Sequence, residues 1–205
     1  MIAVPDILHM LELFKKYITT QSPIDVEQIQ YIYSFSNEKK VNKNEFVLHE
    51  GEISPTHFVT KGLLCLSRIN DLGNDHILKF APENRWISDR ESYLKNSPAA
   101  LNIRAVEDSS MLTWKKTDFD HLLNELPLFR QLMKQLSAKN QIANQTRLYK
   151  SISLSAEDKY LDIIINQPGL HNRVPLHMIA SYLGLSRETL SRVRKGLAKD
   201  KKQYH

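Results

Sequence analysis

The sequence contains very little cysteine, a single residue among 205, and this scarcity excludes several kinds of site. With Cys65 alone, one chain can form no internal disulfide and cannot hold an iron–sulfur cluster by several of its own thiolates. Cys65 lies in the apolar run 63–66. We therefore expect a buried, small hydrophobic side chain rather than a redox sensor.

Long hydrophobic runs are also missing. No apolar segment approaches the roughly 18 residues that span a membrane, and residues 1–10 lack the basic region, apolar core and cleavage site of a signal peptide. Hydrophobic residues make up 41% and charged residues 25% of the chain. These features predict a globular, cytoplasmic protein of one large or two modest domains, without contact to a membrane.

Motifs of catalytic and cofactor sites are absent too. The chain has no nucleophile elbow, no Gly-rich phosphate loop and no H-E-x-x-H segment. Its eight histidines are scattered, and none forms a metal-ligand spacing with Cys65 or with a carboxylate cluster. We therefore expect no enzyme, no cofactor and no bound metal.

Residues 174–197 carry the most informative pattern that is present. Two short amphipathic helices are predicted on either side of Gly184, which suits the left-handed position that ends a helix, and Ser186 is a good N-cap for the second helix. This arrangement is typical of a helix-turn-helix. The apolar residues that the two helices and their turn would bury are Ile179, Ala180, Leu183, Leu185, Leu190, Val193 and Leu197.

The second of these helices has a polar face opposite its apolar stripe. At 100° per residue this face collects Glu188, Ser191, Arg192 and Lys195, with Arg187 on one flank. Arginine can bond guanine and glutamate can accept from cytosine, while Ser186 and Thr189 can reach phosphate oxygens. The face fits a DNA major groove, and the alternative is an ordinary solvated face of a helical hairpin.

Positive charge is concentrated in the same part of the chain. Residues 171–205 contain eight Lys or Arg and two acidic residues, which gives +6, whereas the other 170 residues hold 20 basic and 21 acidic residues. Because the whole net charge is +5, all of the excess lies on the helix-turn-helix segment. This distribution favours a nucleic-acid partner.

Upstream, the pattern predicts a β-sandwich or jelly-roll barrel behind two N-terminal helices, 6–17 and 24–35, the second of which opens at Pro23 or Asp25. A hairpin turn is expected at 71–74, between two of several short apolar runs. The strands are expected at 45–48, 57–59, 63–69, 76–80, 86–87, 101–106 and 110–114.

A long helix is predicted to follow this barrel. Thr117 is expected to cap a short helix before it, Pro127 suits its first turn, and about 24 residues to Lys150 would span roughly 36 Å. Its broken apolar stripe is either a dimer seam, with Asn140 as a register-setting polar contact, or a face packed only on the barrel. Residues 151–154 are expected to form a hinge, and the stripe consists of Phe129, Leu132, Met133, Leu136, Ile142 and Ala143.

This order of barrel, long helix and helix-turn-helix resembles the Crp/Fnr family of bacterial transcription regulators over nearly the whole chain. The segment 186–192, Ser-Arg-Glu-Thr-Leu-Ser-Arg, is similar to the family's recognition signature Ser-Arg-Glu-Thr-x-x-Arg. The resemblance implies that Arg187, Glu188 and Arg192 read bases and that Ser186 and Thr189 contact phosphates. It implies an α+β fold with a cyclic-nucleotide-binding-like domain at 1–126, a dimerisation helix at 127–150 and a DNA-binding domain at 151–205.

The barrel departs from the nucleotide-binding pattern of that family. The family's Glu, which holds the ribose hydroxyl, corresponds to Asp89, followed by Arg90, and its phosphate-binding Arg and the next hydroxyl residue correspond to Ala99 and Ala100. A buried phosphate without a cation would carry a large desolvation cost, so we do not expect ordinary cyclic AMP binding. The alternative is that a cyclic nucleotide still binds, with Asp89 on a ribose hydroxyl and Arg90 as a substitute cation; otherwise the pocket holds another effector or is vestigial. The adenine-contacting positions would be Asn144 and Gln145.

The C-terminus departs as well, because no strand pattern of a β-wing follows the recognition helix, and Lys199, Lys201 and Lys202 would replace the wing's phosphate contacts. The expected partners are double-stranded DNA with a palindromic operator, a second copy of the chain, RNA polymerase and an unidentified small-molecule effector. The alternative is an effector-binding barrel whose helical tail docks a protein, but the tail lacks an exposed apolar anchor.

Overall fold

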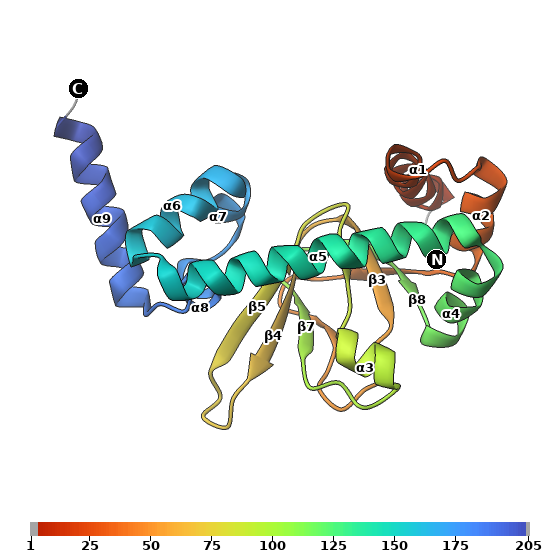
Figure 1. Ribbon diagram of the computed structural model, residues 1–205, viewed down its shortest axis with the longest axis horizontal. Helices are drawn as coiled ribbons and strands as arrows, with labels where there is room; N and C mark the ends of the chain where they lie inside the picture. Colours follow the sequence, from red (N-terminus) through yellow and green to blue (C-terminus); the bar gives the residue numbers. More distant parts are fainter. Residues whose placement is uncertain (1–3, 204–205) are drawn as a thin grey trace. The chain divides into compact units, whose positions relative to one another are not determined.

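The computed structural model describes the backbone of residues 4–203 and the side chains of residues 9–198. It divides the chain into two units (Figure 1). The first comprises the chain up to Ile69 together with Leu78–Ala138, and the second comprises Asn70–Ile77 together with the chain from Lys139 onward. The division in the long helix falls between residues 138 and 139.

Two helices open the first unit, as the sequence predicted. α1 runs from Val4 to Gln21 and α2 from Val26 to Ser34. Asp25, rather than Pro23, begins α2, because its carboxylate accepts a hydrogen bond from the Gln28 amide at 2.8 Å.

Eight strands form two four-stranded sheets, with the orders β1-β8-β3-β6 and β2-β7-β4-β5. The strand pairs β1–β8, β3–β8, β3–β6, β2–β7 and β4–β7 are antiparallel. This is the predicted β-sandwich. The strands are β1 (Asn37–Val41), β2 (Phe46–Leu48), β3 (Thr56–Lys61), β4 (Leu64–Ile69), β5 (Asp75–Ala81), β6 (Trp86–Ile87), β7 (Asn102–Ala105) and β8 (Ser109–Trp114).

Two hydrophobic cores hold the first unit together. One fills the space between the sheets with side chains from both, among them Val59, Ile103 and Met111. The other joins the opposite side of the β1-β8-β3-β6 sheet to the helices, where Phe14 packs edge-on against Phe58 at 5.2 Å between ring centroids. The adjacent β3 residues Phe58 and Val59 therefore pack into different cores, because successive side chains of a strand point to opposite faces of the sheet. Cys65 is fully buried, as predicted.

The helices α4 (Lys116–Glu125) and α5 (Pro127–Ser153) correct two predictions. Thr117 lies inside α4, and the N-cap is Lys115, whose side chain makes no capping bond. A residue with helical neighbours on both sides cannot cap, so that prediction is wrong. Pro127 does begin α5, but the expected hinge at 151–154 is wrong over most of its length, because α5 continues as a helix of 27 residues through Ser153.

The apolar residues of α5 lie on two faces rather than one. Phe129 and Leu132 are buried in the helix-covered core of the first unit. Ile142, by contrast, is exposed, together with Tyr149 and Ile152. At 100° per residue all three lie about 140–160° around the helix from Phe129, whereas Ile142 lies only about 80° from Leu132. The stripe is broken, as the sequence predicted, and its first half packs within the chain's own first unit.

Helices build the larger part of the second unit. α6 (Ala156–Asn166) begins at Ser155, whose hydroxyl accepts from the Asp158 amide at 3.1 Å. α7 (Leu170–Arg173) follows after the short connection Gln167-Pro168-Gly169. α8 (Leu176–Leu183) and α9 (Arg187–Gln203) form the helix-turn-helix. Within residues 4–203 no strand follows α9, and the side chains of Lys199, Lys201 and Lys202 lie outside the described residues. None of the described helices has the length and hydropathy of a membrane span.

Candidate functional site

The turn between α8 and α9 has the geometry that its sequence predicted. Gly184 adopts the left-handed conformation, with φ at +67°, and ends α8. The Leu185 amide donates back to the Ala180 carbonyl at 2.9 Å. Ser186 then caps α9, because its hydroxyl accepts from the Thr189 amide at 3.0 Å. The start of α9 is thus fixed by local hydrogen bonds.

The predicted recognition residues lie on the solvent-facing part of α9. Leu190 is completely buried and anchors the helix to its unit, while Arg187, Glu188, Arg192 and Lys195 are exposed. Ser191 and Thr189 are half-buried, and the Thr189 hydroxyl accepts from Arg192 Nη2 at 3.4 Å. Arg192 is thereby oriented along the helix without an acidic partner among the described ion pairs.

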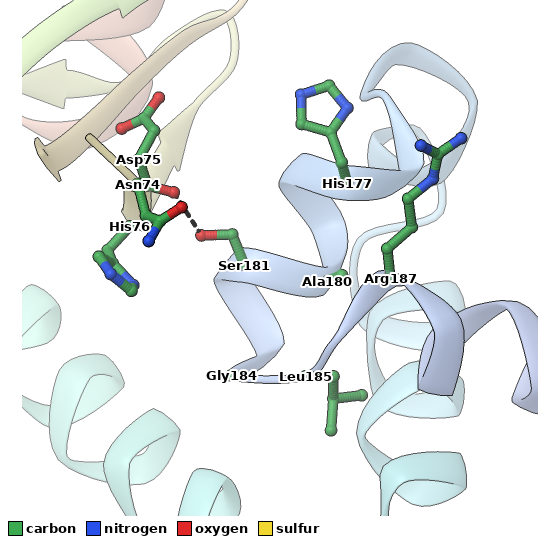
Figure 2. A pocket seen from close by; sticks show the side chains of 9 residues that line it. All are labelled: Asn74, Asp75, His76, His177, Ala180, Ser181, Gly184, Leu185 and Arg187. Atoms are coloured by element: carbon green, nitrogen blue, oxygen red, sulfur yellow. Dashed lines mark hydrogen bonds between the residues drawn. The ribbon is translucent and has the colours of Figure 1, made fainter. Parts of the chain in front are cut away.

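Arg187 also lines a hollow of about 390 Å³ within the second unit (Figure 2). One wall is the segment 74–76 and the other is formed by α8 and the turn after it. Ser181 connects the two walls, because its hydroxyl donates to the Asp75 carbonyl at 2.9 Å (Figure 2). The same hydroxyl accepts from the Ile77 amide, also at 2.9 Å. No sequence pattern indicated a role for Ser181, since the two bonded positions are more than 100 residues away along the chain.

The barrel residues assigned to an effector pocket meet around the short helix α3 (Arg90–Lys95). Asp89 is its N-cap, and the Asp89 carboxylate also accepts the Ala100 amide at 3.0 Å. Ala99 is 2% exposed and belongs to the core between the sheets. Arg90 is exposed on α3. The structure therefore brings Asp89, Ala99 and Ala100 together.

Asn144 and Gln145, the predicted adenine-contacting positions, are exposed on α5. They belong to the second unit, whereas Asp89, Arg90, Ala99 and Ala100 belong to the first. Their assignment to an effector remains a prediction.

The donors and acceptors near Asp89 do not fit a cyclic nucleotide. The Asp89 carboxylate already accepts three backbone amides, two on Oδ1 and one on Oδ2, which leaves about one of its roughly four acceptor positions for a ribose hydroxyl. The methyl groups of Ala99 and Ala100 supply no hydrogen-bond donor to a phosphate. A cyclic nucleotide would thus bring a buried negative charge to a place that already holds one.

Comparison with known proteins agrees with this architecture. Residues 38–125 match the cyclic nucleotide-binding domain family. No curated protein matches the sequence.

Three solved structures illustrate the shared fold. The c-di-GMP-responsive global regulator CLP of Xanthomonas campestris is similar at a TM-score of 0.72 and 14% identity, covering 86% of this chain and 93% of that one. FixK2 of Bradyrhizobium japonicum is similar at 0.68 and 17% identity, covering 80% and 85%. The catabolite activator protein of Thermus thermophilus is similar at 0.53 and 21% identity, covering 87% and 85%. Residues 38–125 are therefore a domain of the cyclic nucleotide-binding type, within a chain that has the fold of the Crp/Fnr transcription regulators.

Proposed function

We propose that this protein is a homodimeric, sequence-specific DNA-binding transcription regulator that does not respond to cyclic AMP through the usual arginine. The exposed face of α9 is the observation that carries the proposal. Arg187, Glu188, Arg192 and Lys195 face solvent on one helix whose opposite side is anchored by the buried Leu190. Such a helix can enter a major groove with its charged side toward the base edges.

Charge supports a nucleic-acid partner over a protein partner. The +6 carried by residues 171–205 would attract the phosphate backbone, whereas a docked protein helix needs an apolar or aromatic anchor. On α9 the larger apolar residues among 187–198 are Leu190, Val193 and Leu197, and each is buried or half-buried. The alternative of a tail that docks a protein therefore has no exposed anchor on this helix.

Dimerisation follows from what a helix-turn-helix needs. Two recognition helices about one DNA turn apart read a palindromic operator with more affinity than one, and the exposed apolar residues of α5 offer a seam for a second copy. A small-molecule effector and contact with RNA polymerase remain predictions from the family resemblance. A regulator of this kind acts in the cytoplasm, where the DNA is.

Selection of bound sites from a random DNA pool is the first test, and a palindromic consensus is the expected result. On that site, Arg192→Ala should weaken binding by about 1 to 3 kcal/mol, concentrated at one base pair, because a bidentate bond to guanine is lost. The measurement is a fluorescence titration against the operator and a set of single-base variants.

Arg194→Ala is the matched control, because it removes the same charge from the same exposed helix but at a position outside the predicted recognition face. It should weaken all sequences about equally and lower the salt dependence by roughly one phosphate contact. Uniform weakening by Arg192→Ala as well would mean that Arg192 contacts only phosphate. A pool that yields no enriched sequence would refute sequence-specific binding.

A further inference from the structure

We propose that Asp89 is a built-in anion that closes the segment 89–100 of the barrel, so that this domain adopts its folded conformation without a cyclic nucleotide. The fold family implies a nucleotide in this region, and the residues present do not fit one. In this chain the Asp89 carboxylate instead makes its contacts within the segment 89–100 itself.

Three backbone amides converge on the Asp89 carboxylate. Oδ1 accepts from Glu91 at 3.0 Å and from Ser92 at 3.2 Å, and Oδ2 accepts from Ala100 at 3.0 Å. The first two amides belong to the start of α3, and the third lies beyond the end of the helix. One carboxylate therefore ties the beginning of the segment to its end.

The surroundings of Asp89 are buried and satisfied. Asp89 is 2% exposed, and Ser54 and Ser92 are equally inaccessible. The Asp89 amide donates to the Ser54 hydroxyl at 2.9 Å, and the Ser54 amide donates to the Ser92 hydroxyl at 3.0 Å. Ser92 in turn donates to the Ser97 carbonyl at 2.6 Å. The two serine hydroxyls and the Asp89 carboxylate thus all make hydrogen bonds with backbone groups of the barrel domain.

No cation among the described ion pairs accompanies the Asp89 carboxylate. Its charge is stabilised by hydrogen bonds alone, as carboxylates with several amide donors are. Where nucleotide-binding relatives carry their arginine, Ala99 is held between backbone groups, its amide on the Glu52 carbonyl at 2.7 Å and its carbonyl on the Gly51 amide at 2.8 Å. A phosphate at this position would therefore meet the Ala99 methyl group and paired backbone groups where those relatives supply a guanidinium.

The first experiment titrates the wild-type protein with cyclic AMP, cyclic GMP and c-di-GMP by calorimetry, up to millimolar concentration. We expect no heat of binding and no shift of the thermal unfolding midpoint. Binding of a cyclic nucleotide with one site per chain in the micromolar range would overturn the proposal. This titration uses the wild-type protein alone, so it tests the absence of nucleotide binding even if a substitution at Asp89 prevents folding.

The second experiment follows amide hydrogen exchange in Asp89→Ala and Asp89→Asn. Loss of the carboxylate should speed exchange at Glu91, Ser92 and Ala100 by at least about tenfold, with a smaller effect in the isosteric Asn variant, which keeps one acceptor oxygen. Acceleration at Glu91 and Ser92 without acceleration at Ala100 would mean that Asp89 is only a helix cap, and would refute the closure of the segment.

Asp25→Ala is the matched control, because Asp25 also caps a helix but sits at an exposed site and accepts one amide. It should lower the thermal midpoint less than Asp89→Ala and leave exchange at Ala100 unchanged. If Asp25→Ala and Asp89→Ala lowered the thermal unfolding midpoint equally, Asp89 would be no more than a helix cap and would not close the segment 89–100. Neither experiment involves DNA, so their outcome is independent of the proposed function.

Discussion

His57 is a titratable side chain that the fold buries almost completely. It lies in β3, 1% exposed, with Nδ1 2.9 Å from the Thr113 hydroxyl. Nε2 is buried without a hydrogen-bond partner among the described residues. Desolvation is the main cause that lowers the pKa of His57 to about 3, and the nearby charge of Lys39 adds to it. The native state therefore holds a neutral imidazole.

This depressed pKa predicts an acid-sensitive stability. Below pH 6.5 the unfolded chain protonates His57 and the folded chain does not, so the unfolded state is favoured progressively as the pH falls toward 3. Between about pH 7.5 and 5.5 the free energy of unfolding should fall by roughly 1.4 kcal/mol through His57 alone. Urea unfolding at the two pH values measures this difference.

His57→Asn is the comparison, because an amide can still reach the Thr113 hydroxyl and does not titrate. Its free energy of unfolding should depend less on pH over the same interval, by the amount that His57 contributes. If the wild type and the variant lose the same free energy, the folded imidazole is not excluded from protonation.

At the scale of elements, hydrophobic periodicity predicted the helices and strands that bury an apolar face, but it missed a strand that is held mainly by pairing with another strand. β1 (Asn37–Val41) was not predicted, because only Val41 in it is buried and the others are polar or charged. It forms by pairing with β8 at a distance of about 70 residues, from Asn37↔Thr113 to Val41↔Ser109. Long-range pairing of this kind leaves no local pattern.

α3 was missed for a different reason. Its capping residue, Asp89, was assigned to a ligand, whereas the carboxylate starts the helix and receives the Ala100 amide. The recognition helix was easier, since Gly184 and Ser186 define its start by local chemistry. The Ala100 amide is eleven residues from Asp89, so this second contact of the carboxylate had no local signal in the sequence.

The hydroxyl of Ser181 on α8 provides a prediction at the same scale. It binds the Asp75 carbonyl and the Ile77 amide at the start of β5, which is the edge strand of its sheet. The hydroxyl thus makes the two hydrogen bonds that a neighbouring strand would otherwise make. Ser181→Ala should lower the stability of the second unit by roughly 1 to 3 kcal/mol, because two partly buried hydrogen bonds are lost. Hydrogen exchange at the Ile77 amide should accelerate accordingly.

Ser181→Thr is the matched control, since it keeps the hydroxyl on the same helix position. The Ile77 amide should stay protected in it, provided that the hydroxyl and not the side-chain volume is what matters. Protection that survives in Ser181→Ala would show that water replaces the hydroxyl at no cost.

At the scale of the whole molecule, α5 raises the question of what covers its second apolar face. Ile142, Tyr149 and Ile152 are 64%, 69% and 79% exposed, and they recur along one side of the helix at intervals of seven and three residues. The buried residues Phe129 and Leu132 lie on a different side of the helix. One helix can therefore pack on its own barrel and still offer a seam to a second copy.

Ile142→Glu tests this seam. A symmetric pairing would bring the two introduced carboxylates close to one another in an apolar contact, and an unpaired charge there is strongly unfavourable. We expect the wild type to sediment as a dimer and the variant as a monomer that binds a single half-site and loses most of its affinity for a palindrome. Leu72→Glu is the control, because Leu72 is 85% exposed in the β4–β5 turn, outside the seam, and this variant should remain dimeric. A wild-type protein that stays monomeric at micromolar concentration, or an Ile142→Glu variant that still dimerises, would show that the exposed face of α5 is not the interface.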